Sequence, residues 1–280
     1  MALTCRQPAP HSGRSGLSFA GVTWGMHIAV LLRLVPDLAE ELEVAESGTD
    51  IDREWVGIKL NEFDDHALEE AILLKERASA TVTAVALDGD GVDRLLQSAI
   101  ARGADRAVKI ANELPPLAPA RTVSGLVAGA VKDLGADLVV TGVQTPEDLG
   151  GQLAPWLGAT LGWPHVSAVS GTEADGGALK VRQEHSGGYS VQLKVALPAV
   201  LGIQTASQPP RYVSGSKLRQ AMSAKLESVE AAAPAGGAAT EVIALAKPER
   251  SGGATMWDGE AEDVAEKLLA VLRERGLLKG

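Results

Sequence analysis

The sequence predicts a doubly wound α/β fold built on a mostly parallel β-sheet, and two observations support this. From Met26 onward, apolar strand-like segments alternate with amphipathic helical segments, which is the order that βαβ units produce. The strand-like segments are continuously apolar, as expected for strands buried on both faces of a parallel sheet. With 280 residues, of which 45% are hydrophobic and 22% charged, the chain can build one large packed core or two small ones.

The individual elements follow from this alternation. Apolar runs predict strands at residues 27–35, 81–87, 106–111, 137–141 and 197–204. Helical periodicity predicts helices at residues 63–78, 92–102, 122–134 and 152–161. Three further short strands, at residues 165–172, 178–185 and 189–195, are joined by Gly-rich turns, and we expect them to form a β-meander at the edge of the sheet.

The C-terminal part of the chain departs from this pattern. Pro209-Pro210 begins an irregular stretch that reaches Lys225, and residues 231–240 have the composition of a linker. Residues 262–277 then show the pattern of an amphipathic helix. We therefore divide the chain into an N-terminal extension at residues 1–25, an α/β domain at 26–228, and a linker with a C-terminal arm at 229–280. The arm could wrap around a partner subunit or fold back on its own domain.

The N-terminal extension admits three interpretations. Residues 1–25 contain Arg6 and Arg14 with several serines, glycines and prolines and no acidic residue. A transit peptide and an ordinary disordered tail share this composition, whereas a secretory signal would need a continuous apolar core. We prefer the third interpretation, in which the functional chain begins at Met26. The protein is then expected in the bacterial cytoplasm, or in the mitochondrial matrix if residues 1–25 are a transit peptide.

The composition excludes several classes of function. A formal charge of −10 with dispersed basic residues argues against a nucleic-acid partner. The single cysteine, Cys5, excludes an intramolecular disulfide and a cysteine-based metal site, and it suits a reducing compartment. No apolar run reaches the roughly 18 to 20 residues that span a bilayer. The five histidines lack metal-ligand spacing and no nucleophile motif is present, so the sequence predicts neither metal-dependent nor hydrolytic catalysis.

The most informative segment is residues 137–152, where an apolar run ends in a polar, Gly-rich turn just before a helical pattern. The carboxyl end of a strand followed by a helix N-terminus offers backbone N–H groups to an anion such as a phosphate. The segment lacks the lysine of a P-loop and the spacing of a dinucleotide-binding fingerprint. A plain strand–turn–helix connection therefore stays open as an alternative.

Paired carboxylates occur on the first predicted helix, as Asp64-Asp65 and Glu69-Glu70. Two neighbouring carboxylates can perform acid–base catalysis. On an amphipathic helix, however, such pairs are far more often a solvated face, and we interpret them in that way.

Several separated segments carry a family resemblance. They are Val-Pro-Asp at 35–37, Asn-Glu-Phe-Asp at 61–64, Arg-Gly-Ala-Asp-Arg-Ala at 102–107, Gly-Val-Gln at 142–144, Leu-Pro-Ala-Val at 197–200, Pro-Arg-Tyr at 210–212 and the closing residues 256–278. In this order and spacing they resemble the β subunit of electron transfer flavoproteins and its relatives associated with nitrogen fixation. The resemblance spans the chain from Met26 to Leu278.

The resemblance implies a Rossmann-like sheet of the adenine nucleotide alpha hydrolase-like type with a partner-binding arm. It implies an electron carrier without chemistry of its own, paired with an α subunit that carries the redox FAD, while this chain holds a structural AMP. Electrons would pass from a flavoprotein dehydrogenase to a quinone oxidoreductase or another acceptor. Two alternatives share the fold: a bifurcating β subunit with a second FAD, and a nucleotide-binding module of universal-stress-protein type.

Carried over residue by residue, the resemblance implies a nucleotide site. Its residues would be Leu31, Asn61, Phe63, Leu87, Gln144, Asp148, Gly150, Gly151, Gln152 and Leu153. Asn61 suits an adenine or ribose hydrogen bond but could equally cap the following helix. Phe63 could cover an adenine face or anchor the helix. We expect Asp148 to order backbone N–H groups rather than contact a phosphate, because like charges repel.

The sequence also departs from the family pattern at this site. Glu62 stands where the family often has proline, Leu153 replaces a hydroxyl residue, and Ala154-Pro155 replace a Gly-led helix start. The lost hydroxyl weakens phosphate binding by roughly 1.5 to 3 kcal/mol. Gly151 and Pro155 still permit a cradle of backbone groups.

A second implied site is the segment that docks onto the partner dehydrogenase. Its residues would be Tyr212, Gly215, Lys217, Leu218 and Arg219. The family commonly places an apolar anchor where this chain has Gly215. Leu218 could substitute as the anchor or could merely pack inward. The basic residues in the segment could steer an acidic partner.

Overall fold

The computed structural model describes residues 25–115, 117–231, 242–248 and 252–278. The extension predicted at residues 1–25 therefore lies outside the described residues except for Gly25, and the linker predicted at 231–240 lies outside them except for Ala231. The chain divides into two compact units, residues 1–245 and residues 246–280, and each is treated on its own.

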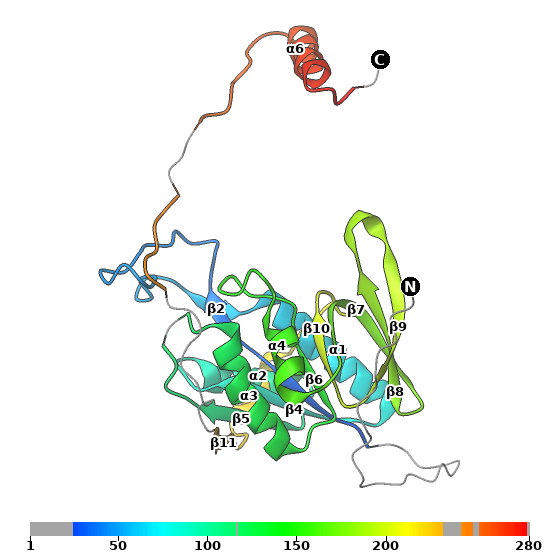
Figure 1. Ribbon diagram of the computed structural model, residues 1–280. Coiled ribbons are helices and arrows are strands. Elements are labelled where there is room, and N and C mark those ends of the chain that lie inside the picture. Colours follow the sequence, from blue (N-terminus) through cyan, green and yellow to red (C-terminus); the bar gives the residue numbers. More distant parts are fainter. Residues whose placement is uncertain (1–24, 116, 232–241, 249–251, 279–280) are drawn as a thin grey trace. The chain divides into compact units, whose positions relative to one another are not determined.

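The first unit is built around a large mixed sheet (Figure 1). Its strands are β1 His27–Leu31, β4 Thr81–Leu87, β5 Arg106–Ala111, β6 Leu138–Gly142, β7 His165–Asp175, β8 Ala178–Glu184, β9 Ser190–Ala196, β10 Ala199–Ile203 and β11 Glu227–Glu230. Among the described residues the strand order is β11-β5-β4-β1-β6-β10-β7-β8-β9. Pairing is parallel from β11 to β7 and antiparallel through β7, β8 and β9. The predicted doubly wound sheet and its edge meander are confirmed.

Helices cover both faces of the sheet. They are α1 Glu62–Ala78, α2 Val92–Arg102, α3 Ala120–Leu134 and α4 Leu153–Leu161. Strand β1 shows why its residues are apolar without alternation. Ile28 and Val30 pack in the core under α1 and α2, whereas Ala29 and Leu31 pack in the core under α3 and α4. A central parallel strand buries both of its faces, so neither face carries polar residues.

The first predicted strand, residues 27–35, was wrong as one element. The structure divides it into β1 and a separate strand β2 Leu34–Pro36, which pairs with β3 Ile58–Leu60 in a second sheet of two antiparallel strands. The break lies at Arg33, whose backbone N–H donates to the Asp64 carboxylate and whose carbonyl accepts from Asn61. Contacts with the start of α1 replace sheet pairing there, and a local apolar run does not reveal them.

Two further elements were missed by the sequence pattern. The stretch after Pro209, predicted as irregular, contains the helix α5 Gly215–Ala221, capped by Ser214, whose hydroxyl accepts from the Lys217 N–H at 3.4 Å. The strand β11 has the sequence Glu-Ser-Val-Glu, which carries no apolar run, yet it pairs in parallel with β5. A short 3₁₀ turn, Ser186–Gly188, joins β8 to β9.

The second unit contains the helix α6 Ala261–Glu274, close to the predicted 262–277. None of its residues is buried. Its apolar side includes Leu268, which is 48% exposed, and Leu269, which is 39% exposed. In the part of the chain that the structure describes, no helix is long and apolar enough to cross a membrane.

A close backbone approach joins β6 to the start of α1. A Cβ atom added to Gly142 would lie 2.5 Å from the Asp64 carboxylate and 2.6 Å from the Phe63 carbonyl carbon. The Gly142 N–H in turn donates to Asp64 at 2.7 Å. Only glycine therefore permits this contact, because any side chain would push the two elements apart.

We expect Gly142→Ala to lower the free energy of unfolding by about 1 to 3 kcal/mol, the usual cost of overpacking a core. The matched change is Gly129→Ala, inside α3, where the new Cβ would lie at an ordinary contact distance of 3.9 Å from Ala231. This change should instead raise stability by roughly 0.5 to 1 kcal/mol, because alanine has a higher helix propensity than glycine. Urea unfolding followed by circular dichroism measures both. Equal stability of the two variants would contradict the close approach at Gly142.

Candidate functional site

The sheet order creates a topological switch point between β1 and β6, because the chain proceeds outward from β1 through β4 and β5 and then returns to β6 on the other side. Ligands of open α/β sheets bind outside the carboxyl ends of the strands at such a point. A cavity of about 480 Å³ lies there. Its walls come from residues that follow β1, β4 and β5, from the loop after β6, and from the loop between β2 and β3.

The cavity combines an apolar wall with a charged one. The apolar side chains include Leu32, Leu34, Leu87, Val92, Val123 and Leu153. The charged side chains are the carboxylates of Asp88, Asp90, Glu147 and Asp148 and the guanidinium groups of Arg33 and Arg53. Its size and its mixture of apolar surface with a few polar groups suit a small organic ligand.

The two arginines of the cavity are already paired. Arg33 binds Asp64, with its Nη2 2.7 Å from Oδ1, and the Asp64 side chain is fully buried. Arg53 lies 3.2 Å from Asp50 and 3.1 Å from Glu147, so it joins the β2–β3 loop to the loop after β6. Burial lowers the pKa of Arg53, but the hydrogen bonds to Asp50 and Glu147 outweigh burial and the pKa is raised.

Asp148 orders the loop that leads into α4. Its carboxylate accepts from the N–H of Gln152 at 3.0 Å and from the N–H of Leu153 at 3.1 Å, and its carbonyl accepts from the N–H of Gly151. The expectation that Asp148 orders backbone N–H groups is confirmed. Gly151 has φ +60 and a Cβ there would lie 2.7 Å from the Val143 carbonyl, so the turn requires glycine.

Asn61 has a different role from helix capping. It occupies the residue before α1, but its side chain makes no capping hydrogen bond. Its Nδ2 instead donates to the Gln144 carbonyl at 2.9 Å, and the side chain is buried. The capping interpretation was therefore wrong. Asn61 links the start of α1 to the loop after β6.

The residues expected at a nucleotide site fall into three groups. Leu87, Asp148 and Leu153 line the cavity. Gln144, Gly150, Gly151 and Gln152 belong to the same loop as Asp148 without lining the cavity, while Leu31, Asn61 and Phe63 are also absent from its lining. Leu31 packs in the core under α3 and α4.

Sequence reasoning missed several residues of the cavity wall. Asp88 and Asn112 come directly after β4 and β5, so the rule that ligands bind at strand carboxyl ends could have found them. Arg33 directly follows the apolar residues of the first strand, and its position gave a similar signal. Arg53 lies in a long loop without any pattern, and nothing in the sequence marks it.

The carboxylates of α1 were wrongly interpreted as a solvated face. Asp64 is 0% exposed, Glu69 2% and Glu70 1%. Asp65 forms an ion pair with Arg102. A buried carboxylate is stable only when cations or hydrogen-bond donors compensate its lost hydration, and each of these groups has such partners.

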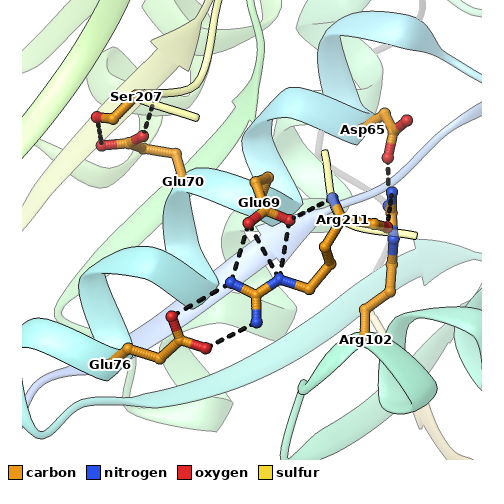
Figure 2. Close-up of polar contacts among 7 residues, drawn as sticks. All are labelled: Asp65, Glu69, Glu70, Glu76, Arg102, Ser207 and Arg211. Atoms are coloured by element: carbon orange, nitrogen blue, oxygen red, sulfur yellow. Dashed lines mark hydrogen bonds and ion pairs between the residues drawn. The ribbon is translucent and has the colours of Figure 1, made fainter. Parts of the chain in front are cut away.

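Glu69 is compensated by an arginine from a distant part of the chain. Figure 2 shows Arg211 between Glu69 and Glu76, which lie two turns apart on α1. Nη2 of Arg211 is 2.9 Å from Glu69, and Nη1 is 2.7 Å from Glu76. The backbone N–H of Arg211 also donates to Glu69 at 3.0 Å. These hydrogen bonds, led by that to Glu76, raise the pKa of Arg211.

Glu70 is compensated by neutral donors. It accepts from the N–H and hydroxyl of Thr172 on β7 at 2.8 and 2.7 Å. It also accepts from the N–H and hydroxyl of Ser207 at 2.6 and 2.9 Å (Figure 2). Helix α1 therefore holds the chain at both Ser207 and Arg211. Because two carboxylates contact this stretch, its position relative to the sheet is set by α1.

The segment that follows is exposed. Tyr212 is 93% exposed and Leu218 is 37% exposed, so Leu218 does not pack inward. Helix α5 is joined to α2 by a hydrogen bond from Gln97 Nε2 to the Met222 carbonyl at 3.1 Å. Gly215 has room around it, since an added Cβ would meet only Arg219, at 3.8 Å. The predicted docking residues thus lie on one surface segment that is anchored at both ends.

The fold and the cavity define an α/β protein with a candidate ligand site at its switch point. The model of the electron transfer flavoprotein domain matches residues 50–235. The chain is 31% identical over 261 residues to electron transfer flavoprotein subunit beta of Methylophilus methylotrophus, covering 89% of this chain and 98% of that protein. It is 35% identical over 193 residues to the subunit beta of Clostridium acetobutylicum, covering 69% and 74%.

The human electron transfer flavoprotein subunit beta is 29% identical over 211 residues, which covers 73% of this chain and 81% of that protein. The chain belongs to the electron transfer flavoprotein beta subunit family. The resemblance drawn from the sequence motifs is confirmed, and the chain is by family an electron-transfer protein.

We expect Glu70→Gln to lower the free energy of unfolding by about 2 to 3 kcal/mol. The amide has one acceptor oxygen and no charge, and its N–H group would face donors of Thr172 or Ser207 that now donate to the carboxylate. Glu62→Gln, at an exposed position in the first turn of the same helix, should cost less than about 1 kcal/mol. Urea unfolding of both variants measures the difference. A cost for Glu70→Gln as small as that for Glu62→Gln would restore the solvated-face interpretation.

The Arg211–Glu76 pair predicts a dependence on pH. The hydrogen bond from Arg211 lowers the pKa of Glu76 below its ordinary value of 4.5. A lowered pKa stabilises the folded state above pH 4.5, and this contribution is lost as the pH falls through the lowered pKa. Because half of the Glu76 side chain is exposed and solvent screens the pair, we expect Glu76→Gln to cost less than about 1 kcal/mol at pH 7.

The difference between the parent and Glu76→Gln should stay constant from about pH 7 down to about pH 5, and should then shrink as the pH falls below 4.5 and through the lowered pKa. Unfolding free energies measured at each pH check this, with Glu113→Gln, at an exposed position, as the control. A difference that stays constant across the range would show that Glu76 acts through something other than its charge.

Proposed function

We propose that this chain is the β subunit of a heterodimeric electron transfer flavoprotein. In this proposal the α subunit carries most of the FAD site, and this chain holds a structural AMP. Electrons enter from a flavoprotein dehydrogenase and leave to an electron transfer flavoprotein–quinone oxidoreductase or a similar acceptor. The observation that carries the proposal is the family match, which extends over 98% of the Methylophilus methylotrophus relative.

The cavity at the switch point supports the assignment of the AMP site. It lies at the carboxyl ends of the central strands, which is where doubly wound folds bind nucleotides. The loop from Gln144 to Leu153 forms part of the surrounding structure, and Leu87, Asp148 and Leu153 line the cavity. In this proposal Gly150, Gly151 and Gln152 belong to the site through the turn that they form around Asp148, and Asn61 holds the loop in place.

Two separate surfaces support the partner assignments. The apolar side of α6 carries Leu268 and Leu269, and in this proposal it binds the α subunit. The segment that includes Tyr212, Lys217, Leu218 and Arg219 offers exposed aromatic, apolar and basic groups, and it suits the donor dehydrogenase. No reacting group is required of this chain.

Co-expression of the full chain with the proposed α subunit tests the proposal. Native mass spectrometry should find a 1:1 heterodimer, and denaturation should release one FAD and one AMP per heterodimer. Release of two FAD would indicate the bifurcating type of subunit. A monomer that releases no nucleotide would show that the fold is present without the proposed function.

The same assay tests the arm. Truncation after Lys247 should abolish the heterodimer, and Leu268→Glu should weaken it strongly because a charge would enter an apolar contact. Glu266→Ala, on the same helix, is the matched control and should leave the heterodimer intact. If the truncated chain still formed the heterodimer, α6 would not be the binding element.

A further inference from the structure

Both arginines in the described lining of the cavity are paired with carboxylates of the protein. Arg33 is bound to Asp64 through Nε at 2.9 Å and Nη2 at 2.7 Å, and its Nη2 also donates to the Gly142 carbonyl. Arg53 is bound to both Asp50 and Glu147. Each guanidinium therefore meets an anion of the protein itself, and neither adds net positive charge to the cavity.

Lys109, which pairs with the cavity carboxylate Asp88, also binds carboxylates of the protein. Lys109 lies 2.9 Å from Asp93 and 3.4 Å from the cavity carboxylate Asp88. The hydrogen bond to Asp93 raises the pKa of Lys109, so the lysine stays charged and paired. Two arginines face four carboxylates in the lining of the cavity, which leaves the lining with a negative formal charge.

The backbone N–H groups of Gln152 and Leu153, at the start of α4, are also occupied. A helix N-terminus at a strand's carboxyl end is the usual anion-binding feature of such folds. Here the N–H groups of Gln152 and Leu153 donate to the Asp148 carboxylate at 3.0 and 3.1 Å. The carboxylate of Asp148 thus stands where a ligand phosphate would be bound, and a phosphate placed there would face a fixed negative charge.

The remaining polar groups suit a donor-rich, uncharged ligand. Asp88 and Asp90 follow β4 and are exposed to the cavity, and carboxylates at this place in a doubly wound fold accept hydrogen bonds from ribose hydroxyl groups. The apolar wall, which includes Leu34, Leu87 and Val92, can cover a flat base. These are the requirements of a nucleoside rather than of a polyphosphate.

We propose that the cavity selects its ligand by low charge and binds the adenosine part of a nucleotide, with Asp148 occupying the phosphate position. This inference rests on the proposed nucleotide site. AMP is then held through its nucleoside, and its phosphate adds no affinity. Each further phosphate lowers affinity by roughly threefold to tenfold, because added negative charge meets the carboxylates of a partly enclosed cavity. The diphosphate of a second FAD is disfavoured for the same reason.

Isothermal titration calorimetry of the full chain, freed of bound nucleotide by dialysis, tests the proposal with adenosine, AMP, ADP and ATP as ligands. We expect adenosine to bind at least as tightly as AMP, followed by ADP and then ATP. The proposal is overturned if AMP, ADP or ATP binds tenfold or more tightly than adenosine. If none of the four ligands binds, the nucleotide site of the proposed function is wrong as well. Tighter binding of the phosphorylated ligands would contradict only the present inference, so the two outcomes can be distinguished.

Asp148→Asn isolates the residue that carries the inference. The amide oxygen can still accept from the backbone N–H groups, but the negative charge is removed. We expect the affinity for AMP relative to adenosine to rise about tenfold. Asp133→Asn, at an exposed position on α3, should leave both affinities unchanged. An unaltered ratio in Asp148→Asn would overturn the role of this carboxylate, and the ranking of ligands by the parent chain is an independent test should the variant not fold.

Discussion

The buried carboxylates of α1 are the interaction on which the rest of the structure depends. Asp64 accepts from the Arg33 backbone and guanidinium and from the Gly142 N–H, so one side chain joins the carboxyl ends of β1 and β6. Those two strands border the topological switch point. A buried charge without such partners would be strongly destabilising, so the partners cannot separate without a large loss of stability.

The same helix links the cavity to the surface segment. Seen along α1, Asp64 contacts the strand ends, Glu70 contacts Ser207, and Glu69 contacts Arg211. The proposed nucleotide cavity and the proposed docking segment therefore share one rigid support. A buried network of this kind favours a single arrangement of its members, because a half-satisfied network would leave charges unpaired. The docking surface can be exposed and still be held in place.

At the cavity, the position in the fold indicates a phosphate site, whereas the charges of the lining residues do not. The position at the switch point, the glycine turn and the helix start all match a phosphate site. The charges do not, because Asp148 occupies the helix start and the arginines are paired with Asp50, Asp64 and Glu147. Fold position alone is thus a poor guide to ligand charge, and the pairing of each charged side chain must be known.

The alternation of apolar runs and helical periodicity determined the fold class, because a strand buried on both faces is apolar throughout, as β10 is. It also located the loop around Asp148, since strand ends and glycine turns are local signals. Only the tertiary structure decided which charged residues are buried and which groups they pair with. Asp64, Glu69 and Glu70 resemble a solvated face until Arg33, Ser207 and Arg211 are brought to them across the chain. Local periodicity reports which side of a helix is apolar, whereas the burial of a carboxylate depends on partners that lie 31 to 142 residues away.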